Sequence, residues 1–118
     1  MSGLTTHVLD TALGQPANRV MIDVFRINEE VREYLRTVHT NADGRVDGGP
    51  ILDSETLRKG TYELVFHVGP YLRFHGHKLS DPPFLDIVPI RFGVGDPQAH
   101  YHVPLLISPF GYSTSRGS

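Results

Sequence analysis

The stretch HYHVPLLI, residues 100–107, alternates between apolar and other side chains with a period of two. One face of this segment carries four apolar side chains, Tyr101, Val103, Leu105 and Ile107. The other face carries two histidines, one proline and one leucine. A two-residue period is typical of a β-strand that buries one of its faces. This stretch therefore predicts a strand and indicates an all-β fold.

Similar alternation or β-rich composition extends outward along most of the chain. It predicts further strands over residues 5–10, 20–27, 33–40, 61–68, 88–94 and 112–115. Pro89 cannot donate to a strand ladder, so the strand over 88–94 is expected at a sheet edge or at a bulge. Repeated short strands separated by turns are typical of a β-sandwich or a barrel.

The segments between these strands are rich in turn-forming residues. Clusters of glycine, proline, asparagine and aspartate predict turns at residues 14–16, 28–30, 43–44, 47–50 and 93–97. Residues 53–56 predict a single helical turn before Gly60, and residues 70–79 predict one short helix because strand alternation is lost there. No linker or internal repeat interrupts the sequence, so residues 1–118 are expected to form a single domain.

Composition excludes several classes of protein. A net charge of −2 over 118 residues gives no support for nucleic-acid binding, which usually requires a basic surface. No apolar run approaches the roughly 18 residues of a membrane span, and residues 1–10 do not look like a signal peptide. Cysteine is absent, which excludes disulfides and thiolate chemistry. A cytoplasmic protein without a membrane or nucleic-acid partner is expected.

One predicted strand face combines histidine with apolar residues. If Val8 and Tyr101 face the core, the outward set consists of His7, Leu9, His102, Pro104 and Leu106. Contiguous exposed apolar surface often marks an interface or a ligand site. Either a second protomer covers this face and leaves both histidines in a shared cleft, or the face is a solvated and moderately apolar sheet surface.

Seven histidines, against no cysteine, make imidazole the main candidate for chemistry. Two His-x-His pairs, His75/His77 and His100/His102, place both rings on one face of an extended strand, as metal binding requires. The segment around His75 and His77 is expected to be flexible and exposed. The metal-free alternative is acid–base catalysis by His7 and His102 with Arg45 holding an anionic oxygen. Spacing alone does not bring Arg45 to the histidines.

Three segments resemble the transthyretin-like family. They are LTTHVLD at 4–10 followed by GQPA at 14–17, GTYEL at 60–64, and HYHVPLLISPFGYST at 100–114. The last is very similar to the closing segment of the 5-hydroxyisourate hydrolases of that family. The resemblance covers essentially the whole chain and implies a two-sheet β-sandwich of about eight strands with one short helix. It also implies a homotetramer, a dimer of dimers, with sites in a channel at the dimer–dimer interface.

The resemblance assigns the candidate site to His7, Arg45 and His102. It implies hydrolysis of 5-hydroxyisourate to 2-oxo-4-hydroxy-4-carboxy-5-ureidoimidazoline (OHCU), with no cofactor and no metal. One histidine, provisionally His7, orients or deprotonates water, and His102 is its partner toward the substrate or the leaving nitrogen. Arg45 neutralises charge on the substrate and on the developing oxyanion. Hormone-carrying transthyretins do not carry this set of three residues.

The C-terminus departs from the family pattern at one position. The family enzymes end in Tyr-Arg-Gly-Ser, and here Arg116, Gly117 and Ser118 match while Ser115 replaces the tyrosine. These four residues are the candidate substrate-binding segment. The replacement is either natural variation with little effect or a change that weakens catalysis and widens the channel. The second interpretation leads to an alternative function, binding of a bulky aromatic ligand such as a thyroid hormone.

Overall fold

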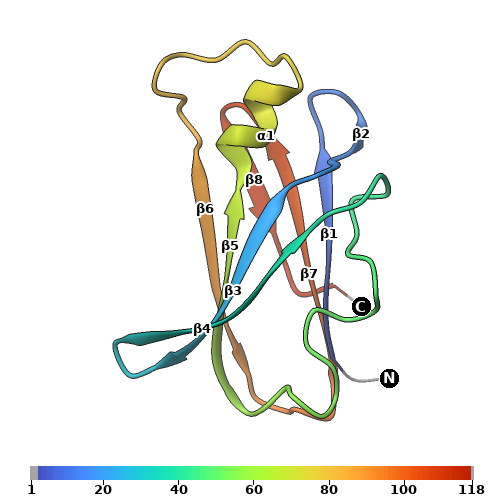
Figure 1. Cartoon of the computed structure of the whole chain (residues 1–118), viewed down its shortest axis with the longest axis vertical. Coiled ribbons are helices and arrows are strands. Elements are labelled where there is room, and N and C mark those ends of the chain that lie inside the picture. Colours follow the sequence, from blue (N-terminus) through green and yellow to red (C-terminus); the bar gives the residue numbers. More distant parts are fainter. Residues whose placement is uncertain (1–2, 118) are drawn as a thin grey trace.

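Two four-stranded sheets face each other and enclose the core (Figure 1). The computed structural model describes residues 3–117. Sheet A has the order β2-β1-β7-β8, formed by Gln15–Pro16, Gly3–Asp10, His100–Ser108 and Gly111–Thr114. Sheet B has the order β4-β3-β5-β6, formed by Val31–His39, Met21–Asn28, Gly60–His67 and Ile87–Val94. The one helix, α1, spans Val68–Phe74 and follows β5 directly.

The inner faces of both sheets are built from the alternating residues that the sequence predicted. The fully buried side chains include Val8, Leu105 and Ile107 from sheet A and Tyr62, Leu64 and Phe66 from sheet B. Alternation places every second side chain of a strand on one face, so both sheets turn apolar surfaces inward. The predicted β-sandwich is therefore confirmed, with strand ends that differ from the prediction by two residues or fewer.

Two of the edge strands contain a proline, Pro16 in β2 and Pro89 in β6. β6 lies at the edge of sheet B, as Pro89 predicted. The prediction of a turn over residues 14–16 is partly wrong, because Gln15 and Pro16 pair with Asp10 and Leu9 to form β2. Pro16 is tolerated there because β2 is an edge strand and needs no further donor on its open side.

Helix α1 begins at Val68, two residues earlier than predicted. The N–H groups of Val68 and Gly69 both donate to the carbonyl of Asp86, at 3.0 Å and 2.9 Å. This contact satisfies donors that the first turn of a helix leaves free. A Cβ at Gly69 would collide with the Asp86 carboxylate, so only glycine permits this approach. The helical turn predicted near residue 53 is present, with the Asp53 side chain accepting from the N–H groups of Glu55 and Thr56.

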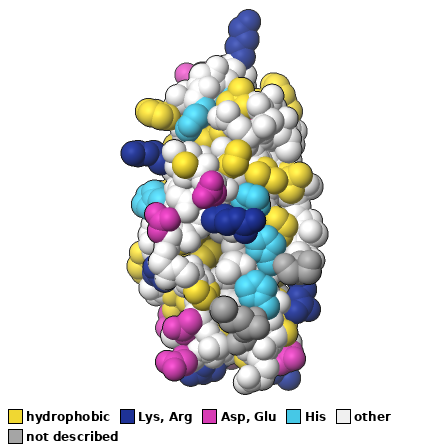
Figure 2. Space-filling model, turned by 90° about the vertical axis from the view of Figure 1, so that its right-hand side faces the viewer, with side chains coloured by type: hydrophobic (Ala, Val, Ile, Leu, Met, Phe, Trp, Pro, Cys, Tyr) yellow, Lys and Arg dark blue, Asp and Glu magenta, His cyan; other side chains and the backbone are white. Residues whose placement is uncertain are grey.

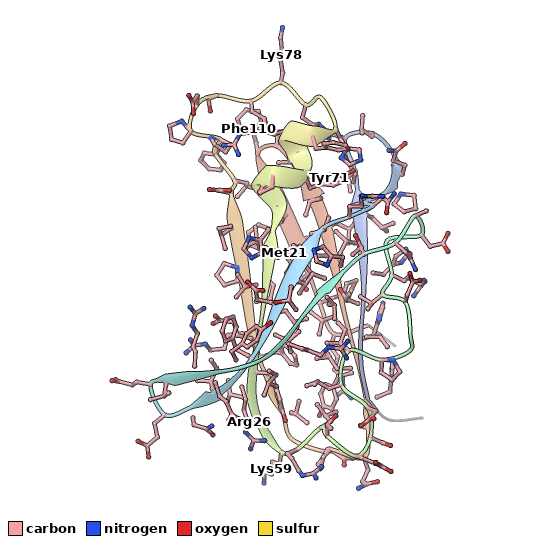
Figure 3. The ribbon with its side chains drawn as sticks, in the orientation of Figure 1. Met21, Arg26, Lys59, Tyr71, Lys78 and Phe110 are labelled. Atoms are coloured by element: carbon pink, nitrogen blue, oxygen red, sulfur yellow. The ribbon has the colours of Figure 1, made fainter. Side chains whose placement is uncertain are left out.

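A buried carboxylate connects β1 to the helical end of the molecule. Asp10 Oδ2 accepts from the Tyr71 hydroxyl at 2.8 Å and from His77 Nε2 at 2.7 Å. Figure 3 places Tyr71 at this end, with Arg26 and Lys59 at the opposite end of the sandwich. Within residues 3–117, no helix is both long and apolar enough to cross a membrane.

Candidate functional site

The outer face of sheet A carries the two histidines that the sequence singled out. β1 and β7 run parallel, and their register places Thr5 beside His102 and His7 beside Pro104. Residues two apart on a strand share a face, so His7 and His102 are diagonal neighbours on the side opposite to the core. Both side chains are half-buried in the single chain, as are Leu9, Pro104 and Leu106. The predicted outward set is therefore confirmed as one continuous face.

A loop from the other sheet covers one edge of this face. After β4, residues 40–46 return to sheet A, where the Val8 N–H donates to the carbonyl of Gly44 at 2.8 Å. Gly44 has a φ of 76°, and a Cβ at that position would collide with the carbonyl oxygen of Val8. The Asn41 side-chain oxygen accepts from the N–H groups of Asp43 and Arg45 and fixes the turn between them. Arg45 follows Gly44 in this loop and is exposed to solvent.

The position of His7 is fixed by the same loop. Its Nε2 donates to the backbone carbonyl of Asp43 at 3.0 Å. Because a carbonyl can only accept, Nε2 carries the proton, and neutral His7 keeps its free lone pair on Nδ1. His7 can therefore accept a proton at Nδ1 without losing its contact to the loop.

His102 lies in a more confined environment. Its Nδ1 is 2.9 Å from the hydroxyl oxygen of Thr5, which also lies 3.0 Å from Nε2 of His100. Burial lowers the pKa of His102, and the positive charge of Arg45 lowers it further, with smaller effects from His100 and His7. Each of these influences disfavours the imidazolium form, so His102 stays neutral to lower pH than an exposed histidine. The effect of Arg45 on this pKa also indicates that Arg45 lies within electrostatic range of His102.

Histidine side chains gather around a cationic side chain in the middle of this face (Figure 2). The view looks onto the side where β1 and the loop after β4 lie in Figure 1. Acidic and apolar side chains are also visible on this side of the molecule. The face thus combines groups that exchange protons with a permanent positive charge, which suits an anionic or oxygen-rich ligand.

The C-terminal segment returns to the same strand. Gly117 donates its N–H to the carbonyl of His102 at 2.7 Å, and a Cβ on Gly117 would lie only 2.7 Å from Cδ2 of that histidine. Of the four candidate substrate-binding residues, Gly117 is therefore in contact with His102. Ser118 lies outside the described residues.

The side chains of Ser115 and Arg116 border a different space. The Arg116 guanidinium lies 4.1 Å from the centre of the Tyr101 ring and donates to the carbonyl of His100 at 3.2 Å. Both residues line a cavity of about 210 Å³ at the edge of the sandwich, together with Phe92, Tyr101 and Thr114. The single chain therefore brings His7, Arg45, His102 and Gly117 together and leaves the Arg116 side chain at the sheet edge.

The two His-x-His pairs do not gather a larger ligand set. The side chain of His77 is only 6% exposed and donates to Asp10, so the expectation of an exposed segment is wrong for this side chain. His75 stacks on Tyr71 with ring centres 4.2 Å apart. His100 and His102 both point a ring nitrogen at the Thr5 hydroxyl. Among residues 3–117, no group of three or more His, Cys, Asp or Glu side chains is arranged to hold a metal ion.

Three residues of the site were missed by sequence reasoning. Thr5 precedes His7 by two positions and would share its face on any strand, but only the parallel register with β7 sets it opposite His102. His100 was considered as a metal ligand rather than as a partner of Thr5. Asn41 lies next to a predicted turn, and its capacity to bond the backbone two residues on was the available signal.

Comparisons with known proteins agree on one family. Residues 4–117 match the model of the HIUase/Transthyretin family. The 5-hydroxyisourate hydrolase 2 of Rhizobium meliloti is 61% identical over 115 residues, which is 98% of this chain and 95% of that protein. The 5-hydroxyisourate hydrolase of Ralstonia nicotianae is 55% identical over the full length of both chains.

Solved structures extend the likeness to two other kinds of protein. An (S)-allantoin synthase superposes with a TM-score of 0.93 at 44% identity over 99% of this chain. This chain spans only 44% of that longer protein. Sea bream transthyretin in complex with thyroxine superposes with a TM-score of 0.84 at 26% identity, covering 97% of this chain and 93% of the transthyretin.

Proposed function

The chain belongs to the HIUase/transthyretin family, and from this membership and the histidine face of sheet A we propose that it is a 5-hydroxyisourate hydrolase. The observation that carries the proposal is that His7 and His102 share one half-buried face, with the exposed Arg45 near enough to lower the pKa of His102. A base, a neutral donor and a fixed cation are the groups that hydrolysis of a cyclic amide needs. Relatives more than half identical to this chain over its whole length carry the same activity in their names.

The proposed reaction converts 5-hydroxyisourate to OHCU. The oxygen of water bonds to the amide carbonyl carbon of the six-membered ring. The carbon–nitrogen bond of that amide then breaks and the ring opens. The carbon becomes a carboxylate carbon, and the freed nitrogen receives a proton to become the end of the ureido group. One water is consumed, and these side chains supply the proton transfers without a cofactor.

His7 is the proposed general base. Its Nε2 is bound to the Asp43 carbonyl, so Nδ1 of the neutral ring is the free proton acceptor. Removal of a proton from water by a positioned base accounts for about 10²- to 10⁴-fold in rate. His102 is its partner, which binds the substrate or passes a proton toward the leaving nitrogen.

Arg45 is the proposed anion-binding residue. Its planar guanidinium matches flat, oxygen-rich rings and stabilises negative charge that develops on the carbonyl oxygen. The loop held by Asn41 supports it at the face. Ser115, Arg116, Gly117 and Ser118 form the proposed substrate-binding segment.

The active form is proposed to be a homotetramer, a dimer of dimers with sites at the dimer–dimer interface. Leu9, Pro104 and Leu106 form apolar surface beside the histidines, and a second copy would exclude water from it. Exclusion of water strengthens the electrostatic contribution of Arg45.

A second candidate function is binding of a bulky aromatic ligand, as in the sea bream transthyretin solved with thyroxine. Ser115 is the observation that favours it, because a small residue stands where the hydrolases of the family have tyrosine. The two functions share the same face and differ in whether the ligand is turned over.

The experiment that separates them follows 5-hydroxyisourate by absorbance, with the compound generated from urate by urate oxidase. We expect the intact protein to accelerate its decay, and His7→Ala and His102→Ala each to reduce kcat by about 10²-fold or more. His39→Ala is the matched control, because His39 is exposed at the end of β4 in the other sheet. A background rate for the intact protein would contradict the hydrolase proposal, as would equal rates for all three variants.

The same assay measures the effect of the departure at residue 115. Ser115→Tyr restores the family residue, and we expect it to raise kcat/KM while the fold is unchanged. Thyroxine binding to both proteins, measured by calorimetry, should be weaker for Ser115→Tyr if the tyrosine narrows the channel. Identical kinetics and binding would mean that Ser115 is a neutral variation.

A further inference from the structure

A single hydroxyl group joins two histidines at the proposed site. Thr5 on β1 lies opposite His102 on β7, and its Oγ1 is within 3.0 Å of both His100 Nε2 and His102 Nδ1. The Thr5 hydroxyl on β1 therefore bridges two side chains of β7, and His102 is the one nearer His7 in the strand register. Two ring nitrogens on one hydroxyl restrict which of the nitrogens carry protons.

The hydroxyl has one proton to donate and can accept at its oxygen. In the first arrangement, His100 donates from Nε2 to Thr5, and Thr5 donates to Nδ1 of His102. In the second arrangement both bonds are reversed, so that His102 donates from Nδ1 and neutral His100 carries its proton on the other nitrogen. In a third arrangement both rings donate to Thr5, whose own proton then lacks an acceptor among residues 3–117.

The surroundings of His100 select the first arrangement. Its Nδ1 is buried and has no hydrogen-bond partner among the described residues. A buried N–H without an acceptor is rare in folded proteins because its lost bond to water is not replaced. The second arrangement would place an N–H at this nitrogen, whereas the first leaves only a lone pair there. The proton of neutral His102 is consequently on Nε2.

We propose that Thr5 and His100 are positioning residues of the hydrolase, which hold His102 in the tautomer that presents an N–H from Nε2 to the substrate. The inference rests on the proposed hydrolase function and goes one step beyond it. His7 has the same tautomer but leaves the other nitrogen free, because its Nε2 proton is bound to Asp43 and its Nδ1 lone pair is unoccupied. His7 is thus the base, and His102 is a hydrogen-bond donor to the carbonyl oxygen of the substrate.

The surroundings of His102 agree with its role as a neutral hydrogen-bond donor. Burial, Arg45, His100 and His7 all lower the pKa of His102. The hydrogen bond from the Thr5 hydroxyl fits the same neutral form, since it is donated to a nitrogen that is bare only in the neutral ring. His102 therefore donates a hydrogen bond as a neutral ring, and His7 delivers the proton that it took from water to the leaving nitrogen.

The test combines a spectroscopic readout with kinetics. In protein labelled with ¹⁵N-histidine, long-range proton–nitrogen spectra report which nitrogen of His102 is protonated. We expect Nε2 in the intact protein. In Thr5→Val we expect a mixture of tautomers, a higher His102 pKa, and a kcat lower by about 10-fold with KM nearly unchanged. Thr5→Ser keeps the hydroxyl and should restore both spectrum and rate.

Three further variants separate positioning from folding. Thr61→Val makes the same change on β5 of the other sheet and should leave the His102 spectrum unaltered. His100→Gln keeps a donor near Thr5 and should retain more activity than His100→Leu. A His102 protonated on Nδ1 in the intact protein would overturn the inference, as would a Thr5→Val protein with unchanged spectrum and kcat. Failure of the hydrolase proposal is a separate result, seen as a background rate in the intact protein.

Discussion

At the scale of single residues, the site depends on two glycines that contact its histidines. Gly44 brings the loop backbone against Val8 and lies next to the ring of His7. Gly117 brings the C-terminal backbone against the ring of His102. In both places the missing side chain is what permits the close approach.

Gly117→Ala is predicted to reduce kcat/KM by about 10- to 100-fold with little loss of stability. The added Cβ would lie 2.7 Å from Cδ2 of His102, so the ring has to shift, and misplacement by about 1 Å costs on the order of 10²-fold in rate. Steady-state kinetics with 5-hydroxyisourate measure the effect. Gly111→Ala is the control, because a Cβ there meets only the Ser108 hydroxyl oxygen at 3.9 Å. Equal activity of the two variants would contradict the prediction.

At the scale of elements, the Asp10 carboxylate connects β1, helix α1 and the segment after it. Burial alone would raise the pKa of Asp10, but bonds from the Leu13 N–H, His77 and Tyr71 outweigh it and lower that pKa overall. The hydrogen bond to Asp10 also raises the pKa of Tyr71, in addition to the larger effect of burial. One buried charge thus connects β1 to a helix, and to the segment after that helix, that lie more than 60 residues later in the chain.

Asp10→Asn is predicted to lower the free energy of unfolding by about 2–3 kcal/mol at pH 7, because a charge-assisted bond to a buried histidine is lost. The folded pKa of Asp10 is below its unfolded value of about 3.9, so the unfolded chain binds more protons in that window. The stabilisation is therefore complete above the unfolded pKa and is lost as pH falls through the folded one. Urea unfolding at several pH values should show that the two proteins differ less in their free energy of unfolding below about pH 4.

Glu30→Gln provides the comparison for that series. Glu30 is exposed in the turn between β3 and β4, and a change at such a position is expected to stay within about 0.5 kcal/mol. If the free energies of unfolding of Asp10→Asn and the intact protein differed by the same amount at every pH, the charge of the carboxylate would not contribute to stability.

Strands were predictable from sequence where local pattern decides them. Tyr62, Leu64 and Phe66 alternate along β5, and their burial follows directly from that alternation. The start of α1 was not predictable, because it depends on the carbonyl of Asp86, 18 residues after Val68 along the chain. His77 looked solvated beside Gly76 for the same reason, since its partner Asp10 lies 67 residues away.

At the scale of the whole molecule, the histidine face is a surface on which apolar side chains are only half-buried in a single chain. Leu9 and Leu106 are paired in the β1–β7 register and are only half-buried. In the proposed tetramer a second dimer covers them and closes the channel around the histidines.

Leu106→Glu is predicted to convert the tetramer to dimers, because a carboxylate at the centre of an apolar interface loses its hydration without gaining a partner. Sedimentation velocity should show a species of about half the mass, and turnover should fall with it because water enters the site. Val31→Glu is the control, since Val31 is 66% exposed at the end of the β3–β4 hairpin. A tetramer that persists in Leu106→Glu would mean that copies meet through another surface.

The candidate site was predictable only in part. The alternation along β1 and β7 predicted that His7 and His102 share an outward face, and the family resemblance added Arg45 to them. The contacts of Thr5, Asn41 and Gly117 depend on strand register and loop return, which no local pattern encodes.

The parallel pairing of β1 with β7 also means that sheet A can assemble only near the end of synthesis. Thr5 meets its partners 95 and 97 residues later, so β1 leaves the ribosome long before β7 exists. At about 5–20 residues per second, several seconds pass between the synthesis of β1 and that of β7, and in that time β1 can pair only with the two-residue β2. Pairings between such distant segments are slow to form, and an unpaired edge invites contact with other nascent chains. A transcript cut before residue 100 would therefore yield a chain that has β1 but can assemble neither sheet A nor the site.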